Sequence, residues 1–382
     1  MNYLYESIAY YWNNNSMNYI KKPEHLFISK LNLILFNIDG VLCNDNKYIP
    51  IARDTFNSLV NRNIPICIIT NECRKSPKLI KKYLKERGFH INHTNNTTHN
   101  TTKKTPQIKI ITSGLLMLNY ISYIINPLSY TLMNLDSKQK SYGKIKSNRK
   151  LNFAIIGEQD IYYYINQNIL NKYDNIKLHW IYDKIAPNNI DYFIITILDN
   201  KSNFEVIQER LITWIKNNPS AKFLITSPEL KNNINVNVNV NVNINDCIYP
   251  KNIIKLLKTN INESNNKYNI HHDMLKQINI NLDYPRKPVN EIIKTELEYH
   301  FDIKIKDSIN KSTNTPVDNS NTNNIMIIDD TIESSFKQYE NLNLYKTLVL
   351  SGKSKYNNLV TIDKEEIDGL DFIIPDISYL VI

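Results

Sequence analysis

The sequence predicts an α/β fold built on a doubly wound parallel sheet. Apolar runs of strand length alternate with amphipathic stretches of helix length along most of the chain, which is the pattern of successive β-α-β units. Two of these runs, 33–42 and 64–71, stop abruptly in polar residues, as buried parallel strands do where they deliver side chains to a site. With 382 residues, 42% of them hydrophobic, the chain can bury the cores of two such units.

The run 33–42 is the clearest strand. Its apolar residues end at Asn37 and Asp39, which flank Ile38. On an extended backbone these two polar side chains point the same way, and Gly40 then allows a sharp turn. We therefore expect a buried strand with a site at its carboxyl end.

The elements that follow alternate between helix and strand. The expected helices are 51–61, 77–87 and 115–125, and the expected strands are 64–69 and 108–112. Ser76 and Pro77 have the features of an N-cap and a first helical residue, and Gly88 those of a helix stop. The polar tract 92–106 is predicted to be a loop, and the tract at about 134–150 a domain boundary.

A fresh alternation predicts a second α/β unit. Its expected strands are 153–156, 176–181, 192–197 and 222–226, and its expected helices are 159–170 and 203–217. Residues 235–245 alternate Asn with Val or Ile. This period of two favours a strand, but we interpret the repeat as an exposed, aggregation-prone insert.

The last part of the chain resumes the first pattern. A helix begins at Lys287-Pro288, and strands are expected at 325–328, 348–350 and 372–374. The predicted organisation is an N-terminal extension over 1–30, a core in two parts over 31–150 and 246–382, and a second unit over 151–245 between them.

Polar residues fall at the ends of predicted strands or at a helix start in four places. They are Asn37/Asp39, Thr70/Asn71, Lys287 and Asp329/Asp330. Taken singly, each has a structural explanation, such as turn chemistry or helix capping. However, doubly wound sheets bind ligands beyond the carboxyl ends of their strands. Carboxylates there suit Mg²⁺, and a hydroxyl, an amide and a lysine suit phosphate oxygens, so together they predict a site for metal and phosphate.

These segments resemble the four motifs of the haloacid dehalogenase superfamily. The matching stretches are 36–42, 68–71, 287–288 and 327–330, with supporting matches at 155–158, 226–229 and 348–352. The wider pattern is similar to the class IIA phosphatases, which include nitrophenylphosphatases, phosphoglycolate phosphatases, NagD and the cat-eye-syndrome-critical-region branch. The resemblance covers roughly residues 31–382 and implies a Rossmann-like core with an inserted α/β cap at 151–245.

The resemblance also implies a role for each candidate residue. The first motif position is an aspartate nucleophile in this family, and here it is Asn37. Asp39 takes the place of the general acid/base. Thr70, Asn71 and Lys287 take the phosphate-binding places, and Asp39, Asp329 and Asp330 take the places of groups that hold Mg²⁺.

The sequence departs from the family at three positions around this site. Asn37 is a neutral amide, which is a poor nucleophile and removes one negative charge from the metal site. Ile328 replaces the usual glycine, and Ser334 stands where a second motif-four acid is expected. The leading hypothesis is a phosphatase-fold protein with impaired or lost activity that retains phosphate binding or acts as a scaffold. The alternative is an active Mg²⁺-dependent phosphomonoesterase acting on a small phosphorylated metabolite.

The composition of the chain favours some kinds of partner and some cellular compartments over others. The net charge of +9 would permit nucleic-acid binding, which would be steeply salt-dependent, but the lysines are scattered and we expect no nucleic-acid partner. The four cysteines form no C-x-x-C pair, as in reduced intracellular proteins. No run approaches the roughly 18 apolar residues of a membrane span. We expect a cytoplasmic protein, with a mitochondrial location as the alternative, whose partner is a small phosphorylated metabolite or a protein. The sequence does not indicate an oligomeric state.

Overall fold

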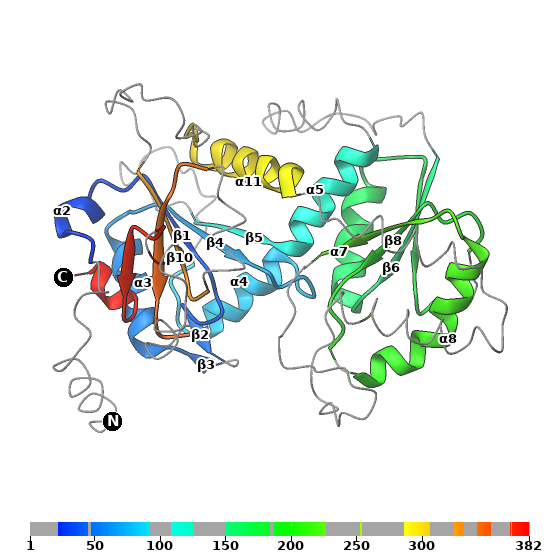
Figure 1. The fold of residues 1–382 in the computed structure, drawn as a ribbon, viewed down its shortest axis with the longest axis horizontal. Coiled ribbons are helices and arrows are strands. Elements are labelled where there is room, and N and C mark those ends of the chain that lie inside the picture. Colours follow the sequence, from blue (N-terminus) through cyan, green and yellow to red (C-terminus); the bar gives the residue numbers. More distant parts are fainter. Residues whose placement is uncertain are drawn as a thin grey trace, which may run out of the picture. The chain divides into compact units, whose positions relative to one another are not determined.

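The chain forms two compact units, shown in Figure 1. The first comprises Met1–Thr70, Lys81–Ile110 and Leu297–Ile382, and the second Asn71–Ile80 and Ile111–Glu296. The computed structural model describes residues 22–44, 47–91, 108–125, 150–183, 187–199, 201–226, 253, 286–305, 324–331, 342–352, 367 and 369–381.

A six-stranded sheet with the order β12-β11-β10-β1-β4-β5 forms the centre of the first unit. Its strands are β1 (Leu33–Phe36), β4 (Ile66–Thr70), β5 (Ile108–Thr112), β10 (Ile325–Asp329), β11 (Tyr345–Val349) and β12 (Phe372–Ile374). β1 pairs in parallel with both β4 and β10, and β11 pairs in parallel with β10 and β12. The chain leaves β1 toward β5 and later builds the other side from β10 to β12, so the predicted doubly wound parallel sheet is confirmed.

The helices of the first unit cover a core that β1 runs through. All four residues of β1 are fully buried, because a central parallel strand is covered on both faces. The ring of Phe36 packs 5.8 Å from that of Phe56 in α3 (Pro50–Asn61). The other helical elements that begin or end in this unit are α2 (His25–Ile28), α4 (Pro77–Glu86), α11 (Arg286–Phe301) and the 3₁₀ helix η4 (Ile377–Leu380).

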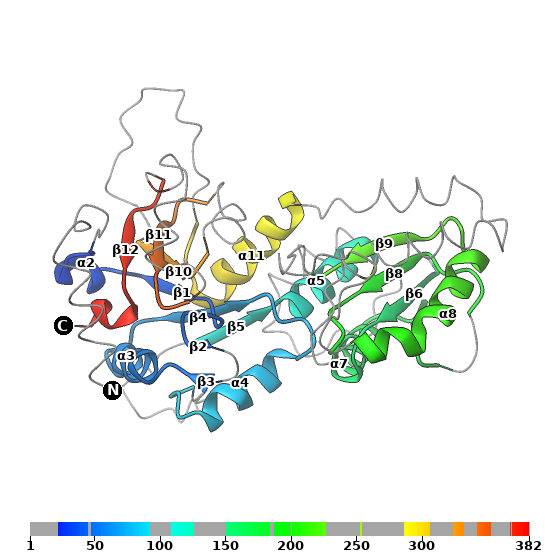
Figure 2. The same cartoon turned by 60° about the horizontal axis from the view of Figure 1, so that its bottom comes forward.

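The second unit is built on a four-stranded parallel sheet with the order β7-β6-β8-β9. The strands are β6 (Leu151–Ile156), β7 (Ile176–Trp180), β8 (Tyr192–Ile195) and β9 (Lys222–Ile225), and its helices are α5 (Ser113–Ile125), α7 (Gln159–Leu170) and α8 (Lys201–Asn217). Alternate residues of β6 serve different cores. Phe153 and Ile155 pack with α5 and α7, whereas Ala154 and Ile156 pack with α8. Figure 2 shows α7 and α8 beside this sheet.

Most predicted elements occur at or near the expected bounds. The start and stop of α4 are confirmed, since the Ser76 Oγ accepts a hydrogen bond from the Leu79 N–H at 3.4 Å and Gly88 has φ +83°. β11 begins three residues earlier than expected, at Tyr345. The sequence did not predict α2 or the hairpin of β2 (Cys43–Asn44) and β3 (Lys47–Tyr48), because elements this short carry no periodic pattern.

Several predictions lie outside the described residues. These are the polar tracts 92–106 and 134–149, the repeat 235–245 and the domain boundary at 245. The domain bounds drawn from these tracts therefore stay predictions. Within the described chain, α5 belongs with the second unit, because its apolar residues pack on the same core as α7.

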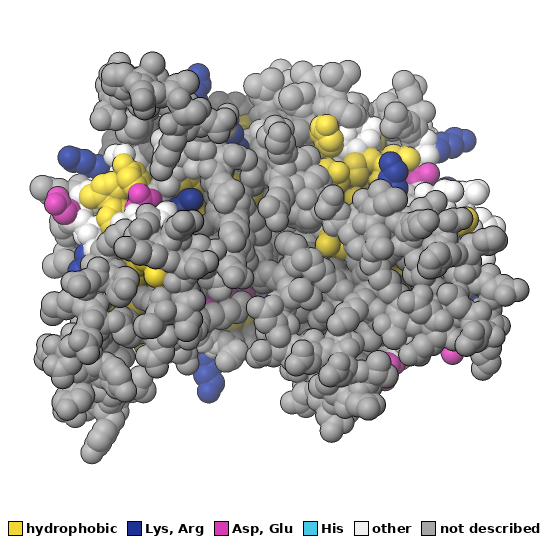
Figure 3. All heavy atoms as spheres, viewed as in Figure 1, with side chains coloured by type: hydrophobic (Ala, Val, Ile, Leu, Met, Phe, Trp, Pro, Cys, Tyr) yellow, Lys and Arg dark blue, Asp and Glu magenta, His cyan; other side chains and the backbone are white. Residues whose placement is uncertain are grey.

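One face of the molecule shows how the described basic side chains are placed on it. In Figure 3, the Lys and Arg side chains are spread over the face shown rather than gathered in one patch. None of the helices in the described part of the chain is long and apolar enough to cross a membrane.

Candidate active site

The first site residue, Asn37, follows β1 directly. Its backbone N–H donates to the carbonyl oxygen of Ile328 at 3.0 Å, which continues the pairing of β1 with β10 by one residue beyond Phe36. The carboxyl ends of the two strands therefore lie side by side where the strand order reverses. This is the position at which doubly wound sheets bind ligands.

The side chain of Asn37 has an orientation that its neighbours determine. The backbone N–H of Ile38 donates to Asn37 Oδ1 at 2.8 Å. The amide nitrogen Nδ2 then donates to Asp329 Oδ1 at 3.2 Å and to the backbone oxygen of Asp39 at 3.4 Å. Because an N–H cannot donate to an NH₂ group, only this assignment of the amide satisfies all three contacts.

Asp329 is one of two buried carboxylates at the end of β10, together with Asp330. Asp329 is only 4% exposed. Its Oδ1 accepts hydrogen bonds from the backbone N–H groups of Asp330 and Thr331 at 2.7 and 3.1 Å and from Thr331 Oγ1 at 3.2 Å. These donors offset the cost of burying the charge. The sequence reasoning missed Thr331. The signal was an Asp two residues before it, the spacing of an Asx turn.

Asp330 is enclosed by two glycines from other loops. A Cβ added to Gly40 would lie 2.0 Å from Asp330 Oδ2, and one added to Gly352 would lie 2.2 Å from the same atom and 2.6 Å from the Cα of Gly40. The loops that follow β1, β10 and β11 therefore meet around one carboxylate. Any side chain at either glycine would displace it.

The turn that carries Asp39 is held by hydrogen bonds. Gly40 has φ +77°, its N–H donates to Cys43 O at 2.7 Å, and its carbonyl accepts from Ser351 Oγ at 2.8 Å. β1 ends at Phe36, so Asn37 and Asp39 lie just beyond the strand rather than within it. Asn37 is half-buried, and Asp39 is exposed.

Cys43, in the turn that follows Asn37, is a candidate for a substitute nucleophile. Burial raises the pKa of its thiol to about 11. The hydrogen bond with Tyr83 and the charge of Arg87 lower this pKa only in part, and the charge of Asp39 raises it further. A thiol with this pKa stays protonated at neutral pH, and the thiolate is the nucleophilic form. Cys43 is therefore unsuited to replace the missing aspartate.

The predicted phosphate-binding residues are distributed as follows. Thr70 is the last residue of β4 and is 3% exposed. It lies two positions beyond Ile68, which pairs with Phe36, so it reaches the same sheet edge as Asn37. Asn71 is half-buried and begins the second unit. Lys287 is the second residue of α11, and its side chain lies outside the described part of the structure.

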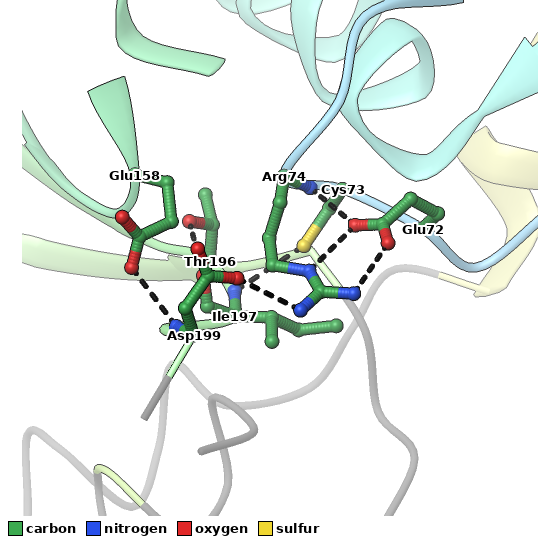
Figure 4. Close-up of polar contacts among 7 residues, drawn as sticks. All are labelled: Glu72, Cys73, Arg74, Glu158, Thr196, Ile197 and Asp199. Atoms are coloured by element: carbon green, nitrogen blue, oxygen red, sulfur yellow. Dashed lines mark hydrogen bonds and ion pairs between the residues drawn. The ribbon is translucent and has the colours of Figure 1, made fainter. Parts of the chain in front are cut away.

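Within the second unit, a polar cluster that sequence reasoning did not find holds the segment after Asn71 (Figure 4). The guanidinium of Arg74 pairs with Glu72, its Nη2 2.6 Å from Oε2, and with Asp199 Oδ1 at 2.8 Å. Burial tends to raise the pKa of Glu72, but the hydrogen bonds and charge of Arg74 outweigh it and the pKa is lowered. The Ile197 N–H also donates to Cys73 Sγ at 3.2 Å.

The groups around Asn37 do not fit a divalent cation. Mg²⁺ takes oxygen ligands, whereas the Asn37 side chain points its NH₂ group at Asp329 Oδ1 and at the backbone oxygen of Asp39. Within the described ranges, no group of three or more His, Cys, Asp or Glu side chains is placed to hold a metal ion. The roles predicted for Asp39, Asp329 and Asp330 as metal ligands stay predictions.

Comparison with known proteins shows which proteins this chain is similar to. Residues 34–125 match the family described as haloacid dehalogenase-like hydrolase. Similar solved structures include a p-nitrophenyl phosphatase from Archaeoglobus fulgidus, with 11% identity and a TM-score of 0.54 over 92% of this chain and 98% of that one. A possible sugar phosphatase of the HAD superfamily from Cytophaga hutchinsonii has 14% identity and a TM-score of 0.53 over 94% and 99%.

A third similar structure is NagD from E. coli, with 13% identity and a TM-score of 0.50 over 91% of this chain and 98% of that one. No curated protein matches the sequence. At these identities the likeness to solved structures shows a shared fold.

Proposed function

Since this chain is a haloacid dehalogenase-like protein with the fold of the class IIA phosphatases, we propose that it binds a small phosphorylated metabolite while its phosphatase activity is impaired or lost. The observation that carries the proposal is Asn37. It follows β1 at the switch point of the sheet, where the resemblance requires the aspartate that attacks phosphorus.

The proposed loss of activity follows from the chemistry of an amide. Asn37 is neutral, and its nitrogen lone pair is delocalised, so it cannot form the phosphoaspartate intermediate of the family. Removing a covalent nucleophile costs on the order of 10⁶ in rate in other enzymes. The raised pKa of Cys43 leaves that neighbouring thiol protonated, so it does not offer a replacement.

The proposed ligand contacts come from the other motif residues. The hydroxyl of Thr70, the amide of Asn71 and the ammonium of Lys287 are donors suited to phosphate oxygens. Asp39 keeps the position of the general acid/base but has no phosphoryl intermediate to act on. The alternative to a metabolite is a protein partner that binds the same surface, in which case the chain acts as a scaffold. We also propose that the protein is cytoplasmic and that nucleic acid is not its ligand.

A Mg²⁺-dependent phosphomonoesterase is the second candidate. Structures named as p-nitrophenyl phosphatase share the fold, and Asp39, Asp329 and Asp330 are the residues that would hold Mg²⁺. This candidate needs a nucleophile other than Asn37.

Hydrolysis of p-nitrophenyl phosphate with Mg²⁺ tests the choice. We expect no turnover above background by the natural chain, and turnover by Asn37→Asp. Asn32→Asp is the matched control, because it makes the same chemical change at an exposed residue just before β1, and it should be inactive. Clear turnover by the natural chain, reduced by Asp39→Asn, would establish the phosphomonoesterase instead.

Phosphate binding is tested separately from turnover. Titration calorimetry with inorganic phosphate should show saturable binding by the natural chain, with a Kd on the order of 1 mM or below. Thr70→Val and Lys287→Met should each weaken it. Failure to bind phosphate would remove the metabolite and leave the scaffold role.

A further inference from the structure

We propose that the Asn37 amide takes the place of a divalent cation beside Asp329, so that a hydrogen-bond donor rather than a metal stabilises this buried carboxylate. The inference rests on the proposed function and adds to it how the buried carboxylate is stabilised. It comes from the three hydrogen-bond contacts of one side chain.

Asn37 Nδ2 lies within hydrogen-bond distance of two oxygens from separate parts of the chain. It is 3.2 Å from Asp329 Oδ1 and 3.4 Å from the backbone oxygen of Asp39. The other end of the amide is held by the Ile38 N–H at 2.8 Å. The NH₂ group is thus turned toward two acceptors and supplies the positive partial charge between them.

A carboxylate at position 37 would turn the attraction between this side chain and the two oxygens into repulsion. An oxygen in the place of Nδ2 would face two other oxygens at similar distances with no hydrogen between them. The three oxygens would then be one from the carboxylate at position 37, Asp329 Oδ1 and the backbone oxygen of Asp39. Two of them belong to carboxylates, and a hard cation prefers such a set of ligands. Without a cation the same set is repulsive.

The remaining contacts of Asp329 show that its Oδ1 is satisfied by protein donors. In addition to Asn37, Oδ1 accepts from Asp330 N, Thr331 N and Thr331 Oγ1 at 2.7 to 3.2 Å. Asp329 is 4% exposed, and a buried charge without compensation would be strongly destabilising. The amide and these three donors together provide that compensation.

Metal binding and thermal melting test the inference in four proteins treated with EDTA and then given Mg²⁺ or Mn²⁺. The natural chain and the control Asn32→Asp should show no saturable binding and no rise in Tm. Asn37→Asp should bind Mn²⁺ about tenfold or more tightly than the natural chain, with a Tm that is lowered in EDTA and restored by the cation. Asp329→Asn added to Asn37→Asp should abolish the restoration.

Two results would overturn the inference. One is cation binding by the natural chain as tight as that of Asn37→Asp, and the other is a folded Asn37→Asp with no gain in cation affinity. Should Asn37→Asp fail to fold, Asn37→Ala provides the test. Alanine adds no charge, and the loss of both Nδ2 hydrogen bonds should lower its Tm in EDTA. A Tm equal to that of the natural chain would contradict the role of the amide.

Phosphate binding in EDTA separates this inference from the proposed function. Saturable phosphate binding by the natural chain in EDTA supports both. If the natural chain binds neither phosphate nor cation, the proposed ligand is wrong and the metal-free site stands. If it binds phosphate only when a divalent cation is present, the metal-free site is wrong and the proposed ligand stands.

Discussion

Gly40 and Asn37, three positions apart, control the local geometry after β1. Gly40 has φ +77°, a conformation that side chains with a Cβ rarely adopt, and its missing side chain leaves room for the carboxylate of Asp330. Asn37 supplies the donor that Asp329 needs. Both residues contact a carboxylate at the end of β10, so a substitution at either should change the geometry of the site.

Gly40→Ala should destabilise the protein more than Gly88→Ala. Both glycines have positive φ, but the nearest atom to an added Cβ is Asp330 Oδ2 at 2.0 Å for Gly40 and the flexible Arg53 Cδ at 3.3 Å for Gly88. The left-handed backbone alone should cost about 1 kcal/mol in Gly88→Ala. Displacement of Asp330 should bring the cost in Gly40→Ala to about 3 kcal/mol. Urea denaturation measures the difference, and equal losses of stability would show that the enclosure of Asp330 has no energetic weight.

Polar contacts hold the segment between β4 and α4. Arg74 joins Glu72 to Asp199, and the backbone N–H of Asp199 donates to Glu158 Oε1 at 2.9 Å. These contacts attach residues 72–74 to the loops that follow β6 and β8, as Figure 4 shows. The segment that follows the predicted phosphate-binding residue Thr70 is thus fastened within the second unit.

Arg74→Met should destabilise the protein by about 2 kcal/mol near neutral pH, because the partly buried charge of Glu72 would lose the guanidinium that pairs with it. The pKa of Glu72 is lowered from 4.5 in the folded chain, so its pairing stabilises the protein above that pH and is lost as the pH falls through the folded pKa. The difference between Arg74→Met and the natural chain should therefore shrink in acid. Urea denaturation at a series of pH values measures it.

Lys82→Met is the control for this prediction. Lys82 pairs with Glu86 at 3.8 Å on the exposed face of α4, with side chains 72% and 59% exposed. Exposed pairs contribute about 0 to 0.5 kcal/mol, so this variant should be close to the natural chain at every pH. A loss in Arg74→Met that does not depend on pH would mean that Arg74 acts through packing rather than through Glu72.

At the scale of the whole molecule, each unit has its own sheet and its own core. Phe36 is buried in the first unit against Phe56. Phe193 is buried in the second, with its ring 5.1 Å from that of Phe223. Separate cores allow domains to open separately.

Phe36→Ala should cost about 3 to 5 kcal/mol through the cavity that it leaves, and amide hydrogen exchange should rise first in the six-stranded sheet. Phe193→Ala is the matched change and should affect the four-stranded sheet first. Hydrogen exchange read by mass spectrometry distinguishes the two sheets by their peptides. Equal loss of protection in both sheets from either variant would show that the units unfold together.

The sequence by itself determined the elements and the residues at their ends. Strand β1, helices α3, α4 and α7 and the parallel character of both sheets follow from hydrophobic periodicity and capping residues, which are local signals. The candidates Asn37, Thr70, Asp329 and Asp330 could be located for the same reason, because polar residues directly after apolar runs are visible without a structure. Short elements such as β2 and β3, with two residues each, have no such signal.

Only the tertiary structure decided how these residues meet. Asn37 and Asp329 are 292 residues apart, and their contact depends on the pairing of β1 with β10. The direction of the Asn37 amide depends on which groups around it donate and which accept. The sequence shows that an amide stands at this position. The structure shows that its N–H groups face the two oxygens, because hydrogen-bond complementarity is a property of the assembled site.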